Sequence, residues 1–242
     1  MRRSSAVLAL ALGLWAPVAL AGETLADFPF WQRMAGWWRA ENTYMDGTLD
    51  YNIRSYNSLV HVELDGRDYR ETEYKFYAPS KLAQQIGQGR LGPDEGIETV
   101  TVVVGTLADA VGTVRQTGLT PSASADDGTY LAVLNADTGV RVTPNAKTGV
   151  DTYRMLIFAP TPDKRYRANF GLVSDRTGPG AANALPGAKP GDLRGFSLFR
   201  EDRIAAGEVD DWRARFRARN KVAAVVEAGP DGTPRVRRLA AE

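Results

Sequence analysis

Short runs in which apolar and polar residues alternate recur along the chain, and this period of two is typical of β-strands. Such strands number roughly ten to twelve, with turn residues between them at regular spacing. By this pattern, or by their content of β-branched and apolar residues, the expected strands are residues 49–54, 60–64, 69–77, 97–107, 111–116, 130–134, 140–143, 153–159, 166–173, 194–200, 222–227 and 235–239. Because the strands do not alternate with long helices, the pattern predicts an all-β fold, an antiparallel barrel or sandwich.

The alternation also predicts which side chains face the interior. In residues 60–64, Val60 and Val62 mark the apolar, inward face, and His61 points outward. Residues 65–66, Asp-Gly, form a hairpin signal that leads into the strand 69–77. In that strand we expect an inward face that includes Arg70, together with its apolar neighbours Thr72, Tyr74 and Phe76.

Three segments depart from this pattern and predict short helices. Phe30, Met34 and Trp37 follow helical spacing, which indicates a helix that plugs the sheet or leads into it. Residues 81–86 form a second short helical piece. Residues 210–220 fit both periods, but they are rich in Ala and Arg and nearly lack β-branched residues, so we favour a helix.

The N-terminus has the order of a secretory signal peptide. Arg2 and Arg3 precede an apolar run over residues 6–18, and an A-x-A site at residues 19–21 follows it. We therefore expect residues 1–21 to be removed after Ala21 and residues 22–242 to form a single β-barrel domain in the periplasm or outside the cell. The run is short for a membrane span, although an uncleaved anchor is the alternative. After cleavage we expect no stable membrane insertion.

Composition narrows the chemistry further. The chain is 43% hydrophobic and 24% charged, with a formal net charge of +1, so no global field favours nucleic acid as a partner. The absence of cysteine excludes thiolate sites, and a single histidine, His61, excludes sites that need two imidazoles. The carboxylates show no ligand array with regular spacing. We expect no metal and no cofactor, although His61 inside a barrel would suit a general base or a haem ligand.

The residues Gly36-Trp37-Trp38, just before the first strand, resemble the short Gly-x-Trp opening motif of the lipocalin-like (calycin) β-barrels. This resemblance implies an antiparallel up-and-down barrel with two or three short helices. It also implies that Trp38 closes the barrel floor against a basic side chain of a late strand, either Arg194 or Arg200. Proteins of that superfamily mostly bind small apolar ligands, and some of them are enzymes.

Several polar side chains on the expected inward faces are candidates for ligand contacts. A guanidinium on such a face must be paired or solvated, so Arg70 and Arg154 would meet a ligand carboxylate, form an internal ion pair or lie at the barrel mouth. Tyrosines line a cavity or pack in the core or at its rim. The candidate ligand-binding residues are Tyr51, Arg70, Tyr74, Arg154 and Tyr166.

Three functions fit these observations. The leading hypothesis is an exported lipocalin-like protein that binds a small, largely apolar molecule, with the loops at 87–96 and 177–192 as possible lids. The second is a metal-independent isomerase, hydratase or lyase on the same barrel, with Tyr and Arg as acid and electrophile. The third is an interaction or scaffold module of the cell envelope.

Overall fold

The computed structural model describes residues 23–46, 56–121, 128–144, 152–172 and 193–240, without the side chains of residues 42–46, 152–154, 170–172 and 193–196. The helices are η1 (Leu25–Asp27), α1 (Pro29–Met34), α2 (Lys81–Ile86), η3 (Ala206–Glu208) and α3 (Val209–Arg219). The first six strands are β1 (Gly36–Asp46), β2 (Tyr56–Asp65), β3 (Asp68–Tyr77), β4 (Gly96–Leu107), β5 (Val114–Thr120) and β6 (Tyr130–Val133). The other six are β7 (Thr138–Thr143), β8 (Thr152–Thr161), β9 (Lys164–Leu172), β10 (Leu193–Ile204), β11 (Val222–Ala228) and β12 (Pro234–Arg238).

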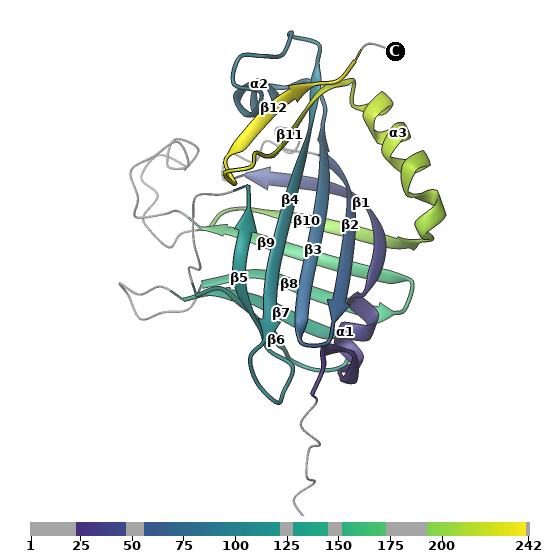
Figure 1. Cartoon of the computed structure of the whole chain (residues 1–242), viewed down its shortest axis with the longest axis vertical. Helices are drawn as coiled ribbons and strands as arrows, with labels where there is room; N and C mark the ends of the chain where they lie inside the picture. Colours follow the sequence, from purple (N-terminus) through teal and green to yellow (C-terminus); the bar gives the residue numbers. More distant parts are fainter. Residues whose placement is uncertain (1–22, 47–55, 122–127, 145–151, 173–192, 241–242) are drawn as a thin grey trace, which may run out of the picture.

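Ten strands close into an antiparallel barrel (Figure 1). Each strand from β1 to β10 pairs with the next one along the chain, and β10 pairs with β1 to complete the circle. The predicted all-β, up-and-down barrel is therefore confirmed. The hairpin β11–β12 lies outside the circle, because β11 pairs in parallel with the first residues of β4 while β5 takes the second half of that strand.

The helix α1 closes one end of the barrel, as the spacing of Phe30 and Met34 predicts, but the inclusion of Trp37 in this helix is wrong because Trp37 lies in β1 (Figure 1). Phe30, Trp31 and Met34 are fully buried there and belong to one core cluster with inward side chains of the strands. The indole Nε1 of Trp31 donates a hydrogen bond of 2.8 Å to the carbonyl of Gly112, which satisfies its one polar atom. This end of the barrel is solid.

The helix α3 covers part of the outer surface, and its presence confirms the helical interpretation of residues 210–220. Its buried Phe216 packs against Leu59 and Phe76, which are outward side chains of β2 and β3. Acidic residues occupy its first turn and arginines its last, which suits the helix dipole. The outer surface of β2 and β3 is therefore apolar where α3 covers it.

This covering helix explains why the predicted facing of β3 is wrong. Tyr69 and Glu71 point into the barrel, with Glu71 only 3% exposed, whereas Tyr74 and Phe76 lie in the cluster under α3. The apolar side of this strand serves the helix interface, and its acidic side serves the interior. In β2 the prediction is confirmed, because Val60 and Val62 are in the core and His61 stacks outside on Trp37.

The Gly-x-Trp segment adopts the role that the resemblance implies, but with other partners. Gly36 has φ +101°, and a β-carbon there would come within 2.7 Å of Arg203 Nη1, so glycine is required. The guanidinium carbons of Arg165 and Arg203 lie 4.6 and 4.3 Å from the Trp38 ring centre. The expectation of Arg200 is wrong because that side chain is exposed on the outer surface, and the side chain of Arg194 lies outside the described residues.

Candidate functional site

Charged residues fill the middle of the barrel. They lie next to Phe30, Trp31 and Trp38, which form an aromatic plug at the end that α1 closes. Arg165 and Glu201 are both fully buried and form an ion pair. The Nη2 of Arg167, a residue only 1% exposed, lies 2.7 Å from Glu201 Oε1 and 3.0 Å from Glu73 Oε1. Buried charges are tolerated when they are paired in this way. The middle of the barrel therefore holds an ionic layer beside the apolar core, where we expected a ligand cavity with a few polar side chains.

The charges of this layer hold one another in their ionised forms. Burial alone would raise the pKa of Glu73, but Lys75 and Arg167 lower it to about 2. Burial would lower the pKa of Arg167, whereas Glu201 and Glu73 raise it well above its usual value. Beside the layer, burial and the nearby Glu71 raise the pKa of the Tyr69 hydroxyl, which donates a hydrogen bond of 2.8 Å to Glu71 Oε2. These charged groups and the Tyr69 hydroxyl therefore interact with one another inside the barrel.

A row of large apolar side chains lies exposed on the outer face of β8, β9 and β10. Leu156 is 40% exposed, Phe158 43%, Tyr166 41% and Leu198 55%, although their neighbours along each strand are buried. The strand register brings them together, because Phe158 pairs with Tyr166, and Leu156 and Leu198 both pair with Ala168. Contiguous exposed apolar surface of this kind marks a binding region.

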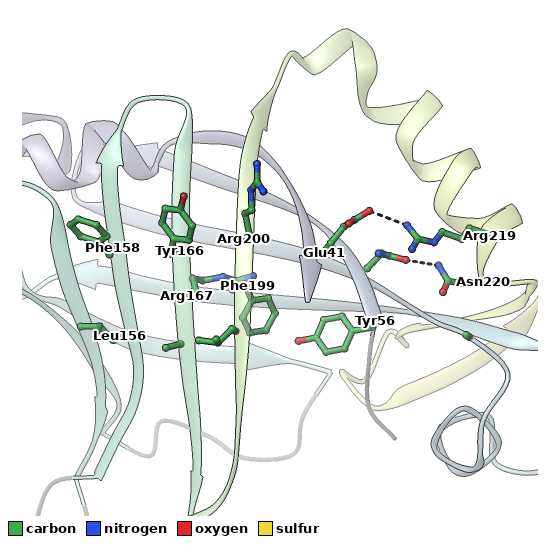
Figure 2. A pocket seen from close by; sticks show the side chains of 14 residues that line it. Glu41, Tyr56, Leu156, Phe158, Tyr166, Arg167, Phe199, Arg200, Arg219 and Asn220 are labelled. Atoms are coloured by element: carbon green, nitrogen blue, oxygen red, sulfur yellow. Dashed lines mark hydrogen bonds and ion pairs between the residues drawn. The ribbon is translucent and has the colours of Figure 1, made fainter. Parts of the chain in front are cut away.

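This row forms one wall of a groove of about 800 Å³. The groove crosses the outer face of β8 to β10 and reaches the first residues of β2 and the end of α3 (Figure 2). On that side Asn220 Nδ2 donates a hydrogen bond of 3.0 Å to Asn57 Oδ1, which ties the end of α3 to β2. The residues that line the groove are Glu41, Tyr56, Asn57, Ala78, Leu156, Phe158, Tyr166, Arg167, Ala168, Leu198, Phe199, Arg200, Arg219 and Asn220.

Two exposed arginines give the groove its charge. Arg219 Nη1 lies 2.9 Å from Glu41 Oε1, so these two charges neutralise each other (Figure 2). Arg200 lies between Tyr166 and Glu41 in the strand register, and among the described residues no carboxylate is paired with it. The groove is thus mostly apolar, with one net positive charge at the level of Arg200.

The structure separates the residues that the sequence singled out as ligand contacts. Tyr166 lines the groove, but it does so from the outer face. Arg70 is exposed on the surface, with its Nε 3.6 Å from Glu63 Oε2, and Tyr74 lies under α3 beside Trp37. Tyr51 and the side chain of Arg154 lie outside the described residues.

Sequence reasoning missed most of the groove. The candidate ligand contacts do not include Leu156, Phe158 or Leu198, and Arg200 is expected to pack on Trp38, because each apolar stripe is taken to face the core. One signal was available: residues 155–159 are apolar at every position, which indicates a strand with apolar surroundings on both faces. In a barrel strand with that pattern, one set of apolar side chains faces the core and the other set lies on the outer surface, as Leu156 and Phe158 do here.

The described residues contain no group of three or more His, Cys, Asp or Glu side chains that could hold a metal ion. Among the described helices, none combines the length and the apolar character needed to cross a membrane.

No family model matches the chain, and no curated protein matches it. Among solved structures, the chain is similar to a protein of unknown function from the DUF3598 family of Nostoc punctiforme, with 13% identity and a TM-score of 0.41. The alignment covers 71% of this chain and 48% of that protein, so the chain spans just under half of its length. A likeness at this level carries no argument about function.

Proposed function

We propose that the protein binds a small, largely apolar molecule in the groove on the outer face of β8, β9 and β10. The observation that carries this proposal is the row formed by Leu156, Phe158, Tyr166 and Leu198, each at least 40% exposed along a groove of about 800 Å³. Ligand pockets measure about 300–1,000 Å³ and have mostly apolar walls. Full burial of a large apolar side chain contributes about 1.5–3 kcal/mol, so covering side chains that are about half exposed contributes roughly half of that each.

We further propose that the barrel is lipocalin-like and that the mature protein works outside the cytoplasm. The up-and-down order of the ten strands and the packing of Trp38 on two arginines support the first part. The order of basic, apolar and A-x-A segments in residues 1–21 supports the second. N-terminal sequencing of the protein from the periplasm or medium of its host should give Gly22 as the first residue. A chain that stays in the cytoplasm with Met1 in place would contradict export.

The binding proposal is tested with N-phenyl-1-naphthylamine, an uncharged apolar dye that fluoresces when it leaves water. Mature wild-type protein should bind the dye saturably. Leu198→Asp places a charge on the groove wall and should weaken binding about tenfold or more, because the variant loses the apolar contact and the ligand would have to cover a carboxylate instead. Leu198 is 55% exposed, so this variant should keep the wild-type circular dichroism spectrum and melting temperature.

The matched control is Val111→Asp, because Val111 is 65% exposed and lies outside the groove. This variant should bind the dye as the wild type does. Equal affinity for the wild type and Leu198→Asp, or no saturable binding by the wild type, would overturn the proposal and favour an interaction module without a small ligand.

A further inference from the structure

The geometry points to an anionic amphiphile as the ligand of the groove: a molecule with one negatively charged head group, which Arg200 binds, on an apolar body that covers the leucines and aromatic rings. This inference rests on the proposed function, because it names the class of molecule for the same groove. Its basis is the way in which the described charges around the groove are already paired.

The groove contains three arginines, and two of them are occupied. Arg167 lines the groove although its side chain lies inside the barrel, where it is paired with Glu73 and Glu201. Arg219 is paired with Glu41 at 2.9 Å. A ligand anion that approached either of these would have to displace a carboxylate.

Arg200 is different because it is exposed and has no ion-pair partner among the described residues. Its register neighbour on β1 is Glu41, but that carboxylate accepts a hydrogen bond from Arg219. Its register neighbour on β9 is Tyr166, which also lines the groove and carries no charge (Figure 2). A guanidinium in this state offers two parallel N–H donors to a carboxylate or another oxyanion.

The apolar wall begins directly beside this charge. Tyr166 pairs in register with Phe158, and Leu198 lies two residues before Arg200 on the same outward side of β10. A head group on Arg200 therefore leaves the attached apolar body over Leu198 and Phe158. A neutral molecule would leave Arg200 partly covered without a partner, which costs free energy, and a cationic molecule would meet repulsion.

The experiment measures displacement of the naphthylamine dye by two ligands of equal chain length, dodecanoate and dodecan-1-ol, below the micelle concentration and at low salt. Dodecanoate should bind about tenfold more tightly than the alcohol, because a hydrogen bond between two charged groups is stronger than one that involves a neutral hydroxyl. The difference should shrink when salt is raised, because the site is partly exposed.

Three variants separate recognition by Arg200 from a general effect of charge. Arg200→Gln should reduce dodecanoate to the affinity of the alcohol and leave the alcohol unchanged. Glu41→Gln releases Arg219 as a second free cation and should tighten dodecanoate, again without effect on the alcohol. Arg70→Gln changes an exposed arginine outside the groove and should leave both affinities unchanged.

The outcomes distinguish this inference from the proposed function. If the alcohol binds as tightly as dodecanoate, or if Arg200→Gln keeps the preference for the anion, the inference is overturned while binding in the groove stands. If neither ligand displaces the dye and the dye itself does not bind saturably, the proposed function fails and the inference fails with it.

Discussion

Arg165 and Glu201 face each other on paired strands in the barrel interior, and both side chains are fully buried as an ion pair. Arg165 also lies 4.6 Å from the Trp38 ring, so this pair connects the ionic layer to the aromatic plug. The pair has a structural role, because burial keeps both charges away from any molecule in solution.

Loss of one partner should be costly. Glu201→Gln leaves Arg165 and Arg167 without their shared carboxylate, and breaking a buried pair in this way costs about 3–5 kcal/mol. Urea unfolding of the variant should show a lower midpoint by a corresponding amount. The control is Glu227→Gln, whose ion pair with Arg237 is exposed and contributes little. A Glu201→Gln protein that is as stable as the wild type would show that the ionic layer does not stabilise the folded protein.

The same layer predicts a stability that depends on pH. The pKa of a glutamate in the unfolded chain is about 4.5, whereas Glu73 in the folded protein has a pKa of about 2. The stability that Glu73 contributes is therefore complete above about pH 4.5 and is lost as the pH falls toward 2. Arg141 and Arg167 likewise lower the pKa of Glu71 against the effect of burial, so Glu71 acts in the same direction.

Unfolding by urea between pH 6 and pH 2.5 measures this effect. The free energy of unfolding should fall across the acidic range, and the slope should be smaller in Glu73→Gln, which has no proton to bind at that position. Parallel slopes for the two proteins would contradict the assignment of the low pKa to Glu73.

One buried carboxylate of β4 forms two of the ion pairs that attach α3 to the barrel. Glu98 is fully buried, and it accepts hydrogen bonds from Arg213 Nη2 at 2.6 Å and Arg217 Nε at 2.6 Å. Glu98→Gln removes the charge that these arginines share, so α3 should loosen while the ten-strand barrel stays intact. Hydrogen exchange should become faster over residues 209–219 and stay slow in β2 and β3.

Glu227→Gln again serves as the control, because Glu227 lies on β11 and contacts no residue of α3 through its ion pair. Unchanged protection of α3 in Glu98→Gln would mean that Phe216 and its apolar contacts hold the helix without the ion pairs.

The backbone architecture follows from local patterns, and for that reason sequence reasoning finds it. Alternation marks the strands, and the spacing of Phe30 and Met34 marks the plug. Residues 65–66 mark a hairpin, and Gly66 in fact takes a φ of +57° there. These signals depend on neighbours in the chain, so they survive without knowledge of the tertiary contacts.

The faces of the strands do not follow from local patterns alone. Among the described side chains of β9, Arg165 and Arg167 are buried, while Tyr166 is exposed. The rule that apolar residues point inward fails here because carboxylates from β3 and β10 neutralise the inward arginines. Strands distant in the sequence supply these partners, and the sequence does not show in advance which ones meet. The candidate groove was missed for the same reason.

The central claim is that the ligand lies on the outer face of β8 and β10, and not inside the barrel. Nuclear Overhauser effects between bound N-phenyl-1-naphthylamine and assigned methyl groups test this directly, because adjacent residues of one strand report opposite faces. The account predicts contacts to the methyl groups of Leu156 and Leu198, and none to those of Met155 and Ile157, which point inward. Contacts to Met155 and Ile157 instead would place the ligand in the barrel interior and contradict the account.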